Sequence, residues 1–286
     1  MTHPSLTVKA LNPHFGAEVS GLDLTQMQSK EIQASLNALL SEYAVLVFPN
    51  QPLNPTQFQS FGEIFGPLMQ QQFKQYLLAD HSMIGYNSTK DLPRKNGKLQ
   101  VRGENYHTDH SNERCPPKAT ALVAVQIPSY GGDTQFVDVR QAYDQLEEDL
   151  KSKILGKFSW HVLMSSRSPR AFTAISEEEK ASMPQCLQPL VIKHPESGRS
   201  ALYLNTGRME GIEGMNKEEG FALIEALYRY ATSPKFEYRH QWRVGDVVIW
   251  DNRSVMHQAN ADYNPEEFRY LYRLMVQGVE LKPADH

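Results

Sequence analysis

The chain has 286 residues, of which 40% are hydrophobic and 22% charged, as in an ordinary globular protein. Its formal net charge of −4 argues against nucleic acid or an anionic membrane as a partner. The two cysteines, Cys115 and Cys186, lie too far apart in sequence to indicate a disulfide framework or a cysteine zinc site. No signal peptide and no run of eighteen apolar residues is present, so we expect a cytoplasmic protein without a membrane span.

The first half of the chain is predicted to alternate helices with short strands. Residues 28–43 place apolar side chains on one helical face and lead into the apolar strand 44–48. Asn54 and Pro55 are a typical N-cap and first-turn residue for the next helix. A buried strand is expected at residues 119–127, and further helices are expected around residues 139–155 and 217–230.

The last third has the alternation of half-buried strands, at residues 236–242, 244–250 and 268–277. In the last of these, Arg269 and Arg273 share one face and aromatic residues occupy the other. With no repeat or linker, we predict one domain over residues 1–286. Its class is α+β but mainly β, with a double-stranded β-helix (jelly-roll) core and flanking helices. Residues 160–188 have weak periodicity and are predicted to form a loop or lid.

His107 and Asp109 form a candidate metal-binding pair. On an extended segment, residues i and i+2 point to the same side, so both side chains can reach one ion. A histidine from a distant strand would complete a two-histidine, one-carboxylate triad, which leaves positions open for O₂ and a co-substrate.

The pair is a weak signal by itself, because ten histidines would supply roughly one His-x-acid pair by chance. A competing pair, His194 and Glu196, lies in His-Pro-Glu-Ser-Gly. That segment is predicted to be a solvated turn joining two strands.

Several separate segments share motifs with one known family: FGAEVSGLDL near the start, then FGPL, YHTD, GGDTQFVD, HPESGR and GDVVIWDNRSVMHQANADY. They occur in order over nearly the whole chain. The chain therefore resembles the taurine dioxygenase / 2,4-dichlorophenoxyacetate dioxygenase family of Fe(II)/2-oxoglutarate-dependent dioxygenases. In that family the distal iron ligand lies four residues beyond WDNR, so the resemblance implies His107, Asp109 and His257 as the catalytic iron ligands.

The resemblance also implies that 2-oxoglutarate is the co-substrate and that Arg269 and Thr134 bind its free carboxylate. A guanidinium offers a planar fork to a carboxylate, and a threonine adds a neutral donor. The implied reaction consumes O₂, releases succinate and CO₂, and hydroxylates a substrate C–H bond. The protein's part is to place the correct C–H near the oxidant.

The substrate-side residues are expected from smaller similarities within the family. Taurine dioxygenases carry histidine and asparagine where this chain has Gln71 and Gly103, which argues against taurine. The segment FGPL-x4-FK instead resembles the aryloxyacetate branch, in which a lysine at the position of Lys74 binds the substrate carboxylate. The family's second arginine, Arg273, is expected to neutralise a substrate acid.

Two departures from the family pattern, Tyr106 and Arg208, are further substrate-side candidates. They stand where a tryptophan and an apolar residue are common, and His110 also departs from the pattern. The extra polar groups favour a polar or multiply charged small acid.

Three other functions fit parts of the sequence. An amino-acid or sulfonate oxygenase of the same family would keep every motif. A non-catalytic metal-binding jelly roll would need a broken triad or a lost Arg269/Thr134 pair, and both are whole. A zinc hydrolase could use the same His/Asp/His set without 2-oxoglutarate. The sequence leaves a homo-oligomer open, because aromatic strand faces pack equally well against helices or another subunit.

Overall fold

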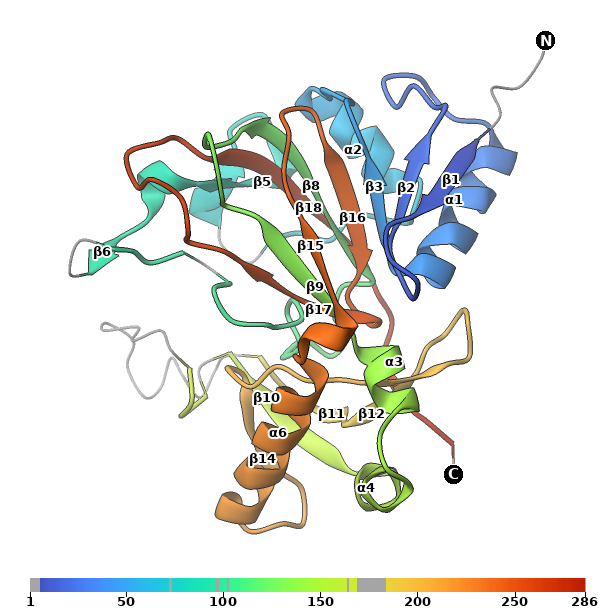
Figure 1. The fold of residues 1–286 in the computed structure, drawn as a ribbon, viewed down its shortest axis with the longest axis vertical. Coiled ribbons are helices and arrows are strands. Elements are labelled where there is room, and N and C mark those ends of the chain that lie inside the picture. Colours follow the sequence, from blue (N-terminus) through green and yellow to red (C-terminus); the bar gives the residue numbers. More distant parts are fainter. Residues whose placement is uncertain are drawn as a thin grey trace.

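The structure is a computed structural model that describes residues 6–71, 74–95, 98–101, 103–163, 165–168 and 184–285. Figure 1 shows an upper part that is mainly sheet and a lower part in which smaller sheets lie beside helices. The predicted mainly β class with flanking helices is confirmed. Within the described ranges, no helix has the length and apolar composition needed to cross a membrane.

The largest sheet has eight strands in the order β1-β2-β3-β16-β8-β18-β5-β4. All of its neighbouring strands are antiparallel except β2 and β3. In that spatial order, the strands are β1 (Thr7–Ala10), β2 (Ala17–Ser20), β3 (Val45–Phe48), β16 (Val247–Asp251), β8 (Ala119–Gln126), β18 (Tyr270–Val276), β5 (His81–Ser88) and β4 (Leu77–Leu78).

The smaller sheets each pair strands from distant parts of the chain. In spatial order, they are β15 (Glu237–His240), β9 (Thr134–Asp138) and β17 (Val255–Ala259); then β11 (Gln185–Pro189), β10 (Phe158–Val162) and β14 (Met209–Ile212); then β13 (Ser200–Leu202), β12 (Val191–Lys193) and β19 (Lys282–Pro283); and the hairpin β6 (Arg94–Lys95) with β7 (Lys98–Leu99).

The helices cover the outer faces of these sheets (Figure 1). They are α1 (Lys30–Tyr43), α2 (Pro55–Glu63), α3 (Val139–Asp144), α4 (Glu148–Ile154) and α6 (Lys217–Ala231), with the 3-10 turns η1 (Lys74–Tyr76), η2 (Thr89–Asp91) and η3 (Pro234–Phe236). The predicted cap of α2 is confirmed, because Asn54 accepts from the backbone of Gln57 and the Gln57 side chain accepts from the backbone of Asn54.

The prediction of one helix over residues 139–155 is wrong, because the chain breaks into α3 and α4. Leu146 lies between the two helices and is buried in the lower core. Glu148 and Asp149 then begin a new helix, where negative charge is favoured by the helix dipole. The inward turn of Leu146 therefore ends the first helix.

The prediction of a loop over residues 160–188 is wrong at both ends. Strands β10 and β11 pair there, with Phe158 opposite Pro189, while residues 169–183 lie outside the described part of the chain. The polar Ser159 and His161 are fully buried and the apolar Trp160 is 43% exposed. This inverted alternation concealed β10 from a reading based on hydrophobicity.

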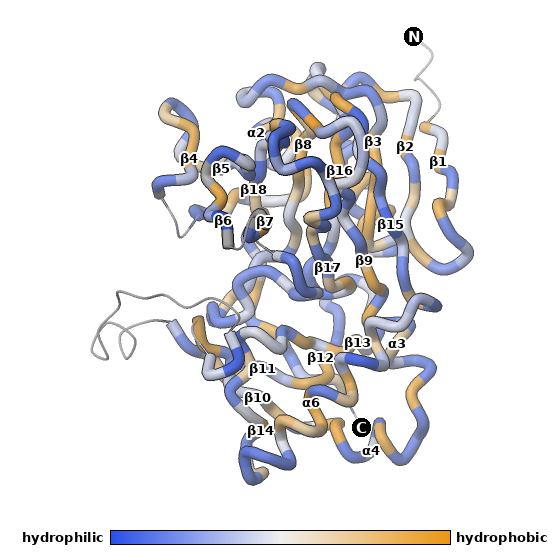
Figure 2. The backbone as a smooth tube through the Cα atoms, turned by 60° about the vertical axis from the view of Figure 1, so that its left-hand side comes forward, coloured by the Kyte–Doolittle hydropathy of each residue, from blue (hydrophilic) through white to orange (hydrophobic). Residues whose placement is uncertain are grey.

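Three buried clusters hold the sheets and helices together. Hydrophobic residues concentrate along β3 and β8 (Figure 2), and every residue of β3 and β16 is buried. The cluster between the smaller sheets and helices of the lower part, here called the lower cluster, includes Val137 of β9 and Met256 of β17. It is therefore continuous with the strands of the upper part. Because β16 is central and leads directly into β17, its position fixes the start of the strand that carries His257.

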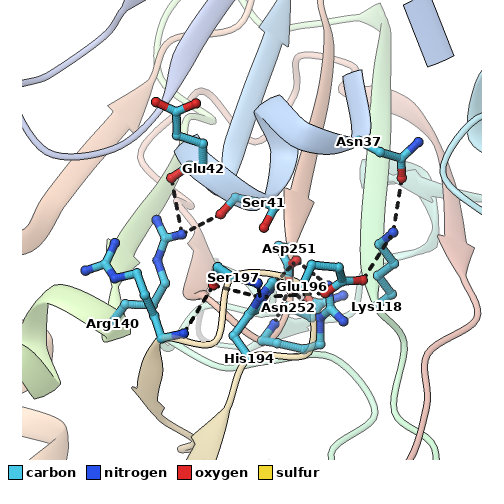
Figure 3. A network of polar contacts seen from close by, with 12 residues as sticks. Asn37, Ser41, Glu42, Lys118, Arg140, His194, Glu196, Ser197, Asp251 and Asn252 are labelled. Carbon is cyan, nitrogen blue, oxygen red and sulfur yellow. Dashed lines mark hydrogen bonds and ion pairs between the residues drawn. The ribbon is translucent and has the colours of Figure 1, made fainter. Parts of the chain in front are cut away.

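A buried ionic network lies at the end of β16 (Figure 3). Asp251 accepts from Arg253 at 2.9 and 2.6 Å and contacts His194 Nε2 at 3.0 Å. Arg253 also pairs with Glu196 at 2.9 Å, and Lys118 lies 3.6 Å from the same carboxylate. Burial alone would raise the pKa of Asp251, but the charge and hydrogen bonds of Arg253, with His194, hold it well below its usual range.

The same network corrects the prediction for His194. Residues 194–199 do form a turn between β12 and β13, as expected, but His194 is fully buried rather than solvated. Its ring holds the turn against the end of β16 through Asp251.

We expect Asp251→Asn to destabilise the fold by about 3–5 kcal/mol, because it leaves the buried Arg253 without its main counter-charge. Urea unfolding would measure the change. Asp144→Asn is the control, since it breaks the exposed Asp144–Arg199 pair and should cost less than about 1 kcal/mol. Equal losses in both variants would contradict a special role for the buried network.

Candidate metal centre and active site

His107 and His257 are brought together by the backbone. Each donates its N–H to the carbonyl of the other, at 3.0 and 2.9 Å, so the two residues are direct antiparallel partners. Their ring centroids lie 4.3 Å apart. Asp109 follows in the next turn, and its carboxylate oxygens lie 3.9 Å from Nε2 of each histidine. One potential ligand atom from each of the three residues therefore falls within 4.8 Å of the others.

The protonation of these groups suits a divalent metal. The His107 Nδ1 lies 2.8 Å from the carbonyl of Asn105, so it carries the proton and leaves Nε2 as the ligand atom. Burial lowers the pKa of His257 to about 3, so its ring is neutral. Burial alone would raise the pKa of Asp109, but Arg273 and the neighbouring histidines hold it well below its usual range. Two neutral imidazoles and an ionised carboxylate are the donor set expected for iron(II).

Arg273 contacts this centre directly. Its Nη2 lies 2.9 Å from Oδ1 of Asp109, and its Nη1 donates to Oε1 of Gln71 at 2.8 Å. The Gln71 amide donates back to the carbonyl of Arg273 at 2.9 Å. Arg273 thus lies beside the candidate metal centre, where the sequence placed it, and pairs there with the carboxylate ligand.

Thr134 lies on the same face of its sheet as His257, and Arg269 contacts the segment that leads into Thr134. Phe136 is the direct partner of His257 in the β9–β17 pair, and Thr134 is two residues along β9, so it shares a face with Phe136 and His257. Gly132, just before Thr134, accepts from Nε of Arg269 at 3.0 Å. The two residues predicted to bind 2-oxoglutarate therefore meet at residues 132–134: Thr134 belongs to this segment, and Arg269 contacts it through Gly132.

The charge of Arg269 has no counter-ion within the described residues. Its side chain is buried, and burial lowers its pKa from the ordinary arginine value. A buried guanidinium without a counter-ion is unfavourable, so this position suits an anionic ligand. Trp242 donates to Oγ1 of Thr134 at 3.0 Å, and this bond fixes the position of the Thr134 hydroxyl.

Tyr106, in contrast, does not lie on the open side of the centre. It is buried in the lower cluster, and its hydroxyl donates to Glu237 at 2.8 Å. Burial followed by the nearby Glu237 carboxylate raises its pKa. The substrate role expected for Tyr106 has no support from this position, because its polar group already has a partner in the core.

The structure describes the other two substrate candidates to different extents. Arg208 is half-buried and donates to Oδ1 of Asn112, three residues after Asp109. Lys74 begins η1, but its side chain lies outside the described residues.

Thr120 is a site residue that the sequence reasoning missed. Its Oγ1 donates to Oδ2 of Asp109 at 2.7 Å from a fully buried position on β8. A single threonine in an apolar strand has the appearance of a core residue. The signal that could have indicated it is the WDNR motif, because Asn252 donates to Thr120 at 2.9 Å.

The fold and the site together define a mainly β protein with a two-histidine, one-carboxylate centre beside two arginines. The sequence model of the "Taurine catabolism dioxygenase TauD, TfdA family" matches residues 7–275. The chain belongs to this family. The predicted family and the dioxygenase class are thereby confirmed.

Two curated relatives are similar over most of their length. The alpha-ketoglutarate-dependent 2,4-dichlorophenoxyacetate dioxygenase of Cupriavidus pinatubonensis (strain JMP 134 / LMG 1197) is 35% identical over 267 residues, 89% of this chain and 92% of that protein. The (S)-phenoxypropionate/alpha-ketoglutarate-dioxygenase of Sphingobium herbicidovorans is 32% identical, with 90% of both chains covered. A solved structure described as AAD-2 in complex with Mn(II) and N-oxalylglycine has a TM-score of 0.84 and 31% identity, covering 98% of this chain and 100% of that one.

Gly103 gives a test of how tightly His107 is held. It has φ +77°, and a Cβ there would lie 2.7 Å from Cε1 of His107. We expect Gly103→Ala to displace the ring and weaken Co(II) binding at least about tenfold, because ligand orientation controls affinity. Gly198→Ala is the matched control, with a φ of +70° and open space around its Cβ. A titration with Co(II), followed by visible absorption, measures the affinity. The prediction is contradicted if both variants bind Co(II) as tightly as the parent does.

His161 gives a pH prediction. Burial and then the charge of Arg208 lower its pKa to about 3. Below pH 6.5, the ordinary pKa of histidine, the unfolded chain therefore binds a proton that the folded chain does not. The stability of the fold therefore decreases as the pH is lowered. We expect this histidine to cost about 2 kcal/mol between pH 7 and pH 5.

His161→Phe keeps a ring against Tyr203 and should remove that part of the pH dependence. Urea unfolding at both pH values measures it. The same loss on acidification in the variant and the parent would show that His161 is not the cause.

Proposed function

We propose that the protein is an Fe(II)- and 2-oxoglutarate-dependent dioxygenase that hydroxylates a small organic acid of the aryloxyalkanoate type, with succinate and CO₂ as co-products. The observation that carries the proposal is the triad of His107, Asp109 and His257, whose ligand atoms lie within 4.8 Å of one another. A second observation is that Arg269 is buried and has no counter-ion among the described residues.

His107, Asp109 and His257 would hold the iron, which when bound supplies the activation of O₂. The chain's own contribution is orientation. The carbonyl of Asn105 fixes the tautomer of His107, and backbone pairing holds His107 against His257. Three protein ligands leave coordination positions open for a chelating co-substrate.

Arg269 and Thr134 would bind the distal carboxylate of 2-oxoglutarate. Because the Trp242 indole donates to Thr134, it occupies a lone pair of that hydroxyl, whose own hydrogen remains available for a carboxylate. The ligand of the similar solved structure, N-oxalylglycine, has the 2-oxoglutarate skeleton with an NH in place of one CH₂. Its presence in a relative of 31% identity supports this assignment.

An acidic substrate is supported by Arg273 and by the names of the relatives, two of which act on aryloxyalkanoates. Arg273 pairs with Asp109 in the structure. A bound divalent cation would neutralise Asp109 and weaken that pair, so the guanidinium could turn to a substrate carboxylate. Lys74, and Arg208 through its charge, remain further candidates for an acidic group.

The fold supports two more inferences. The eight-stranded sheet and the β15-β9-β17 sheet would be the two halves of the predicted jelly roll, with His257 on the smaller one. Residues 1–286 would act as one domain, because the lower cluster includes residues of β9 and β17.

The test is succinate formation and O₂ consumption with Fe(II), ascorbate and 2-oxoglutarate over a panel of aryloxyalkanoates, sulfonates and amino acids. We expect substrate-dependent succinate with at least one aryloxyalkanoate. Turnover with sulfonates or amino acids alone would favour the alternative oxygenase. Hydrolysis with Zn(II) and no need for 2-oxoglutarate would favour the zinc hydrolase.

Co-substrate binding tests the site directly. We expect Arg269→Ala to weaken 2-oxoglutarate binding about 10- to 100-fold, because charge-assisted hydrogen bonds contribute about 1.5–3 kcal/mol. The visible charge-transfer band of the Fe(II) complex reports binding, and His107→Ala should abolish it. Arg199→Ala, at an exposed ion pair, is the control and should bind normally. Unchanged affinity in Arg269→Ala would exclude it from the co-substrate site.

A further inference from the structure

A chain of buried hydrogen bonds connects the turn after β16 to the candidate carboxylate ligand. The Trp250 indole donates to Oδ1 of Asn252 at 3.1 Å, and Nδ2 of Asn252 donates to Oγ1 of Thr120 at 2.9 Å. Thr120 in turn donates to Oδ2 of Asp109 at 2.7 Å. Trp250, Asn252 and Thr120 are each 2% exposed or less, so water does not compete for these bonds.

The direction of every bond in this chain is set by chemistry. An indole N–H can only donate, so Asn252 must turn its carbonyl oxygen to Trp250 and its NH₂ to Thr120. The threonine oxygen then accepts from the amide, and its single hydrogen points to Asp109. The Asp109 carboxylate at the end accepts that hydrogen.

The same residues also hold the histidine side of the centre. The Trp250 ring lies 4.6 Å from the His257 ring, centroid to centroid. The hydroxyl of Thr108 donates to the backbone carbonyl of Asn252 at 2.7 Å, which ties the segment between His107 and Asp109 to the β16–β17 turn. Trp250 and Thr120 are direct partners across β16 and β8, so the register of the sheet fixes where this series of hydrogen bonds begins.

We propose that Trp250, Asn252 and Thr120 are positioning residues that hold the Asp109 carboxylate in the orientation needed to bind metal. The inference rests on the metal centre of the proposed function and adds the residues that orient it. With the threonine hydroxyl on one oxygen, the carboxylate cannot rotate without breaking a buried hydrogen bond. A buried hydroxyl donor left unpaired by such a rotation costs about 1–3 kcal/mol.

The experiment measures metal binding by the full-length protein, with Co(II) followed by visible absorption and Mn(II) by electron paramagnetic resonance. We expect Thr120→Val, which keeps the shape and removes the donor, to weaken binding of both ions about 10- to 100-fold. Thr120→Ser keeps the hydroxyl and should bind within about threefold of the parent. Trp250→Phe keeps a ring beside His257 but frees the amide of Asn252 to flip, so a smaller loss is expected.

Ser159→Ala is the matched control, since Ser159 is fully buried and donates to the carbonyl of Gly211 at 2.7 Å in the lower sheets. It should leave metal affinity unchanged. The melting temperature and circular dichroism of each metal-free variant show whether it is folded. If Thr120→Val does not fold, the comparison of Thr120→Ser with Trp250→Phe carries the test.

The outcomes separate the two proposals. Normal metal binding by folded Thr120→Val, or by Trp250→Phe with Thr120→Ser, overturns the positioning role and leaves the metal centre intact. Absence of metal binding in the parent protein overturns the metal centre, and the positioning role with it. A loss in Thr120→Val that Thr120→Ser restores supports the inference.

Discussion

The carboxylate of Asp109 is a buried negative charge, and such a charge must be balanced or solvated by the protein itself. The groups that surround it come from distant parts of the chain: Thr120 from β8, His257 from β17 and Arg273 from β18. Thr120 supplies a hydrogen bond and Arg273 a favourable charge, and the neutral ring of His257 lies 3.9 Å away. Satisfying this carboxylate therefore requires these strands to keep their register, and local site geometry depends on the whole upper part of the fold.

Arg269 and Arg273 show how the same residue type can differ in charge balance within one strand. Arg273 has a carboxylate at 2.9 Å, whereas Arg269 is buried and has only the carbonyl of Gly132 as a side-chain partner in the described part of the chain. An uncompensated buried cation destabilises the protein until an anion arrives. The fold therefore leaves the charge of Arg269 without a counter-ion among the described residues, while the charge of Arg273 is balanced by Asp109.

The sequence was sufficient where local chemistry determines structure. Asn54 and Pro55 predicted the start of α2, because capping depends on a few adjacent residues. It failed where tertiary contacts override local patterns. Ser159 and His161 point inward on β10, so the strand lacked its hydrophobic signature, and Leu146 ended a helix by turning into the core.

The site was predictable to a similar extent. His107 and Asp109 were a weak signal by themselves, and the family resemblance implied His257; the structure brings the three together. Tyr106 was chosen because it departs from the family pattern, but adjacent residues on an extended segment point to opposite sides, and its side chain faces the core. Thr120 was missed because it is a single threonine in an apolar strand, and its partner Asn252 lies 132 residues away in the sequence.

The end of β16 explains why one short motif serves both the fold and the site. Alternate side chains on an extended segment face opposite sides. Trp250 and Asn252 face His257 and Thr120, at the metal centre. Asp251 and Arg253 face the other way, into the network with His194. Since the backbone is shared, the ion pair that holds one face also fixes the position of the amide on the other. Stability at one side of the strand is therefore a condition for ligand orientation at the other.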